Sequence, residues 1–159
     1  MDADTGQIAA ATLTGCKIDG ASQVGALLDQ MVRPAATFTT NRAYDQDGVY
    51  GPVAIRHPEA SVIVPPRSSA VPSDEAQTAL IMRDRHLPIM AERGRMAWQT
   101  VSGYYYRALA KAIINRFKHV IGDGLRSGTE GLRATEIAIA LSALNRMLEL
   151  GRPEYIRLP

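Results

Sequence analysis

Residues 35–64 read AATFTTNRAYDQDGVYGPVAIRHPEASVIV, and they contain the clearest structural pattern in the 159-residue chain. Residues 35–40 are rich in β-branched and aromatic side chains, which predicts a strand. A helix is predicted from about residue 47 to residue 56. The short apolar run at 61–64 predicts a buried strand, which a Pro-Pro pair ends.

Two further elements are predicted before this stretch. Residues 7–14 read as a strand after an Asp-Thr-Gly turn, although their alanines are weak strand formers. Residues 21–31 are a predicted amphipathic helix with Ser22 as its N-cap. The buried stripe of this helix is expected to be Val24, Leu27, Leu28 and Met31. The alternation of strands and helices favours an α/β layered fold.

The second half of the chain is predicted to be helical. A polar loop over 67–83 leads into a modest helix over 84–93. A long helix over 101–121 follows and is ended by Gly-Asp-Gly. After a polar linker over 127–133, a last helix is predicted over 134–150.

The helix predicted over 101–121 has two distinct faces when its residues are placed at about 100° intervals. The apolar face, expected to pack in the core, consists of Tyr106, Ala110, Ile113, Phe117 and Val120. The polar face consists of Tyr104, Arg107, Lys111 and Lys118. Such a polar face is most often simply solvated, so only its spacing can carry a functional argument.

That spacing resembles the Tyr-x2-Arg-x3-Glu-x6-Lys signature of bacterial insertion-sequence transposases of the DDE type, in insertion-sequence family five and its relatives. The signature segment here is GYYYRALAKAIINRFKHVIGD at 103–123. Its Tyr, Arg and Lys positions hold Tyr104, Arg107 and Lys118. Lys111 stands where the family has its last catalytic acid.

Other segments resemble the same family in the same order. FTTNRAYDQDGVY at 38–50 resembles the strand-end motif that carries the second catalytic Asp, and Asn41 occupies that position. DADTGQIAAATLTG at the start resembles a hairpin of the domain, and ALNRMLELGRPEY near the end resembles the family's tail. The resemblance therefore covers almost the whole chain.

The resemblance implies an RNase-H-like (retroviral-integrase-like) fold, a mixed sheet with flanking helices, truncated here at its N-terminus. Residues 1–125 would form part of the catalytic domain, and residues 126–159 a helical tail packed on it. The family's first acid lies on a strand expected before Met1, because Asp2 and Asp4 match the hairpin turn instead.

In the intact family, three acids bind two Mg²⁺ ions, which clamp the attacking and leaving oxygens of a phosphoryl transfer. Asn41 offers only a neutral carbonyl oxygen, and the Lys111 ammonium has no lone pair for a metal. No metal or other cofactor is therefore expected for this chain, and the family's activity is expected to be lost. The resemblance implies that Tyr104, Arg107 and Lys118 face DNA.

The remaining polar and aromatic side chains have plainer interpretations. Acids that complement helix dipoles are expected at Asp45, Asp47 and Glu136. The histidines share no ligand spacing and are expected at the surface: His57, His86 and His119. Trp98 and the three tyrosines at 104–106 either pack in the core and its rim or stack on DNA bases.

The composition of the chain excludes fewer functional classes than the motifs above do. Hydrophobic residues make up 46% and charged residues 21%, which is typical of a folded globular protein. The net charge of +2 does not by itself indicate a nucleic-acid partner, but Lys and Arg concentrate in the second half. A single cysteine, Cys16, with no signal peptide or membrane span predicts a cytoplasmic protein, associated with the nucleoid if it binds DNA.

Two functions are predicted. The first is a fragment of a transposase that no longer catalyses transposition. The alternative is a non-catalytic fragment that binds DNA or intact transposase and thereby inhibits transposition. The expected partners are transposon ends and target DNA, intact transposase or a second copy of the chain, and no membrane. A scaffold unrelated to DNA has no sequence feature in its favour.

Overall fold

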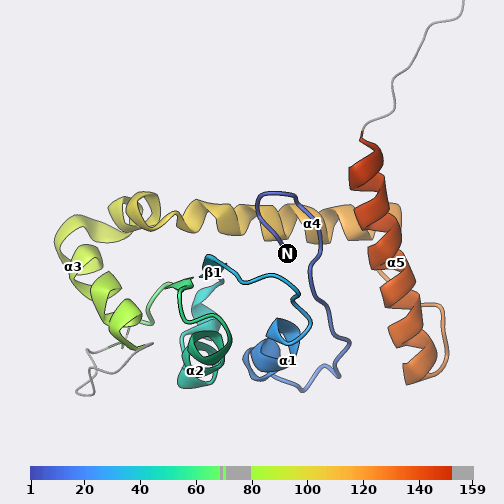
Figure 1. Ribbon diagram of the computed structural model, residues 1–159, viewed down its shortest axis with the longest axis horizontal. Helices are drawn as coiled ribbons and strands as arrows, with labels where there is room; N and C mark the ends of the chain where they lie inside the picture. The colour runs from blue at the N-terminus through green and yellow to red at the C-terminus, as the bar shows by residue number, and fades with distance from the viewer. Residues whose placement is uncertain (69, 71–79, 152–159) are drawn as a thin grey trace, which may run out of the picture. The chain divides into compact units, whose positions relative to one another are not determined.

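The structure of the chain is a computed structural model, which describes residues 1–68, 70 and 80–151. Figure 1 shows the elements in chain order from blue to red. They are η1 (Gly20–Gln23), α1 (Val24–Leu28), β1 (Thr37–Thr39), η2 (Arg42–Tyr44), α2 (Asp47–Arg56), β2 (Ser61–Ile63), α3 (Leu80–Ser102), η3 (Tyr104–Tyr106), α4 (Arg107–Val120) and α5 (Glu130–Leu150).

The chain divides into two compact units. The central unit consists of residues 14–108, and the terminal unit joins residues 1–13 to residues 109–159. The first 13 residues thus group with the C-terminal helices, whereas the resemblance implies that they belong to the catalytic domain. The packing of residues 126–159 on a domain of residues 1–125 stays a prediction.

The central unit is built on the strand, helix and strand predicted over 35–64. Strands β1 and β2 pair in parallel, with Phe38 opposite Val62, and α2 connects them. Parallel neighbours need a crossover connection, which α2 provides between two short strands. The described residues contain this two-stranded sheet and no further strand, so the RNase-H-like sheet stays a prediction.

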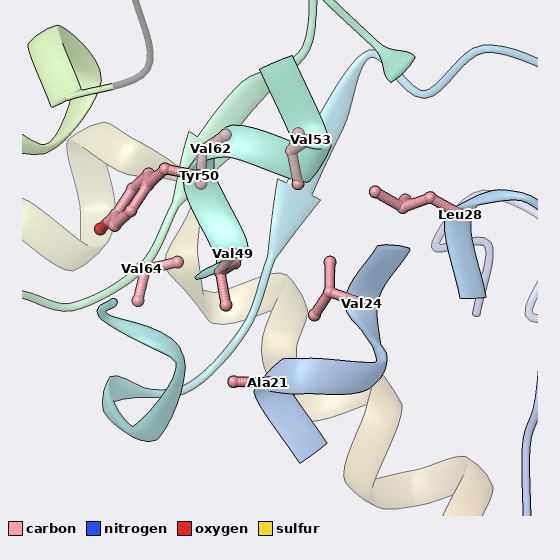
Figure 2. Packing of buried hydrophobic residues seen from close by; sticks show 8 residues of the cluster. All are labelled: Ala21, Val24, Leu28, Val49, Tyr50, Val53, Val62 and Val64. Carbon is pink, nitrogen blue, oxygen red and sulfur yellow. The ribbon is translucent and has the colours of Figure 1, made fainter. Parts of the chain in front are cut away.

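A valine-rich cluster forms the core of the central unit (Figure 2). It takes side chains from η1, α1, α2, β2 and the residue after β2: Ala21, Val24, Leu28, Val49, Tyr50, Val53, Val62 and Val64. The branched side chains suit strands, and in α2 they recur at helical spacing. A bidentate ion pair between Arg56 and Asp29 also ties α2 to the end of α1.

The helix predicted over 21–31 is shorter than expected and is capped by a different residue. Its first turn is the 3₁₀ helix η1, and Asp19 rather than Ser22 accepts a hydrogen bond from the Ala21 N–H. The Asp19 carboxylate also accepts a hydrogen bond from the Gln46 amide. Asp19 therefore links the start of η1 to the segment before α2, which Ser22 could not do from inside the turn.

Helix α3 contains the helix predicted over 84–93 and continues beyond it. Gly94 interrupts α3 with a positive φ of 75°, so the predicted end after residue 93 corresponds to a real break. The prediction of a loop over 67–83 falls mostly on residues 71–79, which lie outside the described residues. At its end this prediction is wrong, because α3 already begins at Leu80.

Two of the three histidines are buried, so the prediction that all lie at the surface is wrong. His86 accepts a hydrogen bond at Nδ1 from the Trp98 indole, 2.9 Å away, and its Nε2 lies 3.2 Å from the Val62 carbonyl. His57 accepts a hydrogen bond from the Ala35 N–H. Both imidazoles are buried and form hydrogen bonds that join separate segments of the central unit.

The strand predicted over 7–14 is absent, and the segment instead binds α5 within the terminal unit. The Asn145 side chain accepts a hydrogen bond from the Ile8 N–H at 2.8 Å and donates one to the Ile8 carbonyl at 3.0 Å. The amide group thus satisfies both backbone polar groups, as a neighbouring strand would. Leu144 and Ala140 are the buried apolar side chains of α5.

Helix α5 begins earlier than predicted, at Glu130, with Thr129 as its N-cap. Glu136 therefore lies beyond the first turn, and its interpretation as a dipole-complementing acid is wrong. Its carboxylate accepts hydrogen bonds from the backbone N–H groups of Arg126 and Ser127. These hydrogen bonds hold the pKa of Glu136 below its ordinary value and fasten the preceding loop to the helix.

None of the helices in the described part of the chain is long and apolar enough to span a bilayer.

Candidate nucleic-acid interface

The segment that resembles the transposase signature begins at a left-handed glycine. Gly103 has φ 72° and ψ 16°, ends the run of α3 and starts the 3₁₀ turn η3. Helix α4 begins only at Arg107. The single helix predicted over 101–121 is therefore wrong in its first turn, because a residue in this conformation cannot continue a right-handed helix.

Tyr104 is the inward-facing member of the tyrosine run. Its ring lies 5.1 Å from the ring of Trp98, between centroids, and is only partly exposed. Trp98 is completely buried and also contacts the His86 ring edge-on. Tyr104 therefore fixes η3 to the aromatic interior of the central unit.

Tyr105 and Tyr106 face solvent and contact each other. Their ring centroids are 4.4 Å apart with planes tilted by 30°, and the residues are 60% and 48% exposed. A side-chain hydrogen bond with Tyr106 raises the pKa of Tyr105. Tyr106 was predicted to pack in the core with the rest of the apolar face, and this prediction is wrong.

Helix α4 contains no buried residue. Val120, another member of the predicted apolar face, is 46% exposed, and Ile113 and Phe117 are only partly buried. The prediction of a core-facing stripe on this helix is therefore wrong for the residues that the structure describes. Its periodicity was amphipathic, but periodicity cannot supply a surface for the apolar face to pack against.

The cations of the resemblance lie exposed on α4: Arg107, Lys111 and Lys118. Within residues 1–68, 70 and 80–151, no carboxylate forms a salt bridge with any of them. The sequence contains no acid from residue 93 to residue 122, so neighbouring side chains in sequence do not neutralise them either. Exposed, unneutralised cations on a helix are available to a polyanion.

Asn41 lies two residues after β1, at the strand end that the resemblance assigns to the second catalytic Asp. Its side-chain oxygen accepts a hydrogen bond from the Ala43 N–H at 2.8 Å and caps η2. That oxygen is the only lone-pair donor on the side chain that a Mg²⁺ ion would use. Asn41 thus has a structural role that is independent of any metal.

Asp45 is a buried structural carboxylate, so the prediction that it complements a helix dipole is wrong. It is buried, accepts a hydrogen bond from the Tyr50 hydroxyl at 2.9 Å and accepts another from the Arg67 N–H at 2.7 Å. It therefore joins the start of α2 to the segment after β2 rather than complementing a helix dipole at the surface. Asp47 does lie in the first turn of α2, as predicted.

The residues that the resemblance assigns to the positions of the catalytic acids do not suit a Mg²⁺ ion. The Asn41 carbonyl oxygen is neutral and already bonded, and the Lys111 ammonium can only repel a cation. Among the described side chains, no group of three or more His, Cys, Asp or Glu residues is placed to hold a metal. No step of a metal-dependent reaction can be derived from these residues.

The predicted site residues fall in both compact units. Asn41, Tyr104 and Arg107 belong to the central unit, and Lys111 and Lys118 belong to the terminal unit. The convergence of Asn41 and Lys111, which the resemblance requires, stays a prediction. The contact between Tyr105 and Tyr106 was not predicted, and its only signal in the sequence is three consecutive tyrosines after a glycine.

No family model matches the chain, and no solved structure matches it.

Proposed function

We propose that this chain is the C-terminal part of the catalytic domain of a DDE transposase and that it no longer catalyses phosphoryl transfer. The observation that carries the proposal is the signature spacing of Tyr104, Arg107 and Lys118, with Lys111 in the acid position. The position of Asn41 just after β1 supports it, because the family carries its second acid at a strand end.

Loss of catalysis follows from the charges at the acid positions. Two unit charges about 4 Å apart interact by roughly 4 kcal/mol at an effective dielectric constant near 20, and a divalent ion doubles this. A Lys111 ammonium at the metal site would therefore repel Mg²⁺ by several kcal/mol. Asn41 contributes no negative charge to offset this repulsion.

A second function, non-catalytic DNA binding that inhibits transposition, is favoured by the exposed cations of α4. Phosphate binding needs positive charge at the surface but no metal, so it survives the loss of the acids. A fragment that occupies transposon ends, or joins intact transposase without completing its active site, would compete with the active enzyme. Either function places the chain in the cytoplasm, on the nucleoid when it is bound to DNA.

The proposed function is tested by measuring duplex-DNA binding and Mg²⁺-dependent strand cleavage with the same preparation. We expect salt-sensitive binding, no cleavage and no stoichiometric Mg²⁺ binding. Arg107→Ala/Lys118→Ala should weaken binding and reduce the salt dependence by about two counterions, because each cation contacts roughly one phosphate.

The control variant is Lys17→Ala/Arg33→Ala, which removes the same charge from exposed residues that are not part of α4. It should bind DNA almost as the unaltered chain does. Equal losses of DNA affinity in both variants would show that only the net charge matters and would refute a specific role for α4. Cleavage by the unaltered chain that a chelator abolishes would refute the inactive assignment.

A further inference from the structure

We propose that the Tyr105–Tyr106 pair is a stacking site for unpaired nucleotide bases, so that the chain binds single-stranded DNA more tightly than duplex DNA. The inference rests on the proposed function for its nucleic-acid partner and adds the form of DNA that is recognised. Its basis is the exposed ring pair, 4.4 Å between centroids, immediately before the first cation of α4.

The ring pair is held in place before any ligand binds. Gly103 turns the backbone, the Tyr106 N–H donates to the Gly103 carbonyl at 3.1 Å, and Tyr104 anchors the turn on Trp98. A tyrosine has few rotatable bonds, and two rings already in contact lose little further freedom when a third ring joins them. A base can therefore extend an existing stack at low entropic cost.

The charge next to the pair in sequence favours a nucleic acid over an apolar partner. Arg107, which is exposed, follows Tyr106 directly, and the sequence contains no acid from residue 93 to residue 122. Aromatic faces beside cations that track a phosphate backbone are the combination by which proteins hold single strands. A partner without negative charge would leave these cations unused.

The ring faces also distinguish unpaired bases from paired ones. In a duplex each base already stacks on its neighbours, so a tyrosine face can contact it only after the stack has opened. Phosphate contacts from Arg107 serve both forms of DNA, and the higher charge density of a duplex gives them no preference for a single strand. Any preference for a single strand must therefore come from the rings.

The test compares an oligothymidine strand with a duplex of equal length in fluorescence anisotropy. Tyr105→Leu/Tyr106→Leu keeps apolar volume but removes both π-faces, and Tyr105→Phe/Tyr106→Phe keeps the faces without the hydroxyls. The Leu variant should bind the single strand about fivefold to a hundredfold more weakly for each base that has stacked. The Phe variant should bind it nearly as the unaltered chain does, and duplex binding should change little in either.

A second readout detects stacking itself. A single strand with one 2-aminopurine should lose fluorescence on binding the unaltered chain and the Phe variant, but not the Leu variant. Fluorescence of Trp98, the sole tryptophan, shows whether each variant has kept its fold. A ribonucleotide strand of 5-methyluridine, which keeps the thymine base and adds only the 2′-hydroxyl, determines whether the sugar matters, since stacking alone would treat the two strands alike.

The outcomes separate the two proposals. Equal single-strand and duplex affinities, with no quenching, would overturn the stacking inference while leaving DNA binding intact. Single-strand binding that the Leu variant retains would overturn it as well, since phosphate contacts would then suffice. Absence of binding to either form would overturn the DNA-binding function from which the inference starts.

Discussion

At the residue scale, His86 shows how burial fixes a proton. An indole N–H can only donate, so the hydrogen bond from Trp98 assigns the lone pair to Nδ1 of His86. The proton of the neutral ring is then on Nε2, where it is donated to the Val62 carbonyl. A second proton would place two N–H groups against each other in the interior.

The first prediction is that stability falls with acid through His86. Burial lowers the pKa of His86 below its ordinary value of 6.5, although the Val62 carbonyl opposes the shift. As the pH falls, His86 therefore binds a proton in the unfolded chain at a higher pH than in the folded chain. The contribution of the neutral His86 to folding stability is complete above about pH 6.5. It is lost as the pH falls through the lower pKa of His86 in the folded state.

The measurement is urea unfolding, followed by Trp98 fluorescence, at about pH 7.5 and about pH 5.5. His86→Gln can keep both hydrogen bonds without titrating, so it should show a smaller loss between these values. His119→Gln, which changes an exposed histidine, should behave as the unaltered chain. Parallel losses in the unaltered chain and His86→Gln would contradict the prediction.

The second prediction concerns the close approach at Gly20. A Cβ added there would lie 2.6 Å from the Tyr44 hydroxyl oxygen, and Tyr44 packs on the core cluster. Gly20→Ala should therefore destabilise the chain by about 1–3 kcal/mol. Gly48→Ala has open space in α2 and should stabilise it by up to about 1 kcal/mol.

A thermal-unfolding cycle with Tyr44→Phe checks the cause. Without the hydroxyl, the nearest Tyr44 ring carbon lies 3.4 Å from the added Cβ, so most of the Gly20→Ala cost should disappear. A cost that is unchanged in the Tyr44→Phe background would mean that backbone conformation, not this contact, requires glycine.

At the scale of elements, sequence patterns predicted the helices and strands whose contacts lie close together in the sequence. The strand, helix and strand over 35–64 could be predicted because the paired strands are separated by one short helix. The start of α4 could not be predicted, because the spacing of apolar residues in the sequence is the same whether the Gly103 backbone is right-handed or left-handed. The predicted strand over 7–14 failed because its partner is a side chain 137 residues away.

The candidate site was predictable to a similar extent. The position of Asn41 after a strand and the exposure of the α4 cations follow from nearby sequence. Burial of Asp45 does not, because it depends on the Arg67 N–H and the Tyr50 hydroxyl, which reach it only in the folded unit. The same holds for the contact between Tyr105 and Tyr106.

The third prediction is that Asn145 stabilises the N-terminal segment. Asn145→Leu leaves the Ile8 N–H and carbonyl without their partners and should cost about 1–3 kcal/mol of unfolding free energy. Amide exchange at Ile8 should accelerate as well. Arg146→Ala, which removes an exposed ion pair with Glu149, should change stability by less than about 1 kcal/mol. Slow exchange at Ile8 in Asn145→Leu would contradict this role.

At the scale of the whole molecule, the proposed transposase function requires one relation between the two units. A DDE centre needs its second and third acid positions to share a pair of metal ions, whatever residues now occupy them. Metals about 4 Å apart with ligand bonds of about 2 Å require the two side-chain ends to lie within roughly 8 Å. The proposed transposase fold therefore predicts that Asn41 and Lys111 lie near each other, even though neither can bind Mg²⁺ as an acid does.

Cysteine cross-linking measures this relation most directly. In a Cys16→Ser background, Asn41→Cys/Lys111→Cys should react efficiently with a bifunctional maleimide that spans about 8 Å. The control, Asn41→Cys/Lys118→Cys, uses a residue seven positions further along α4, about 10 Å away along the helix axis. We predict an intramolecular cross-link for the first pair and little for the second. Failure of the first pair to cross-link, or equal yields for both, would contradict the transposase assignment.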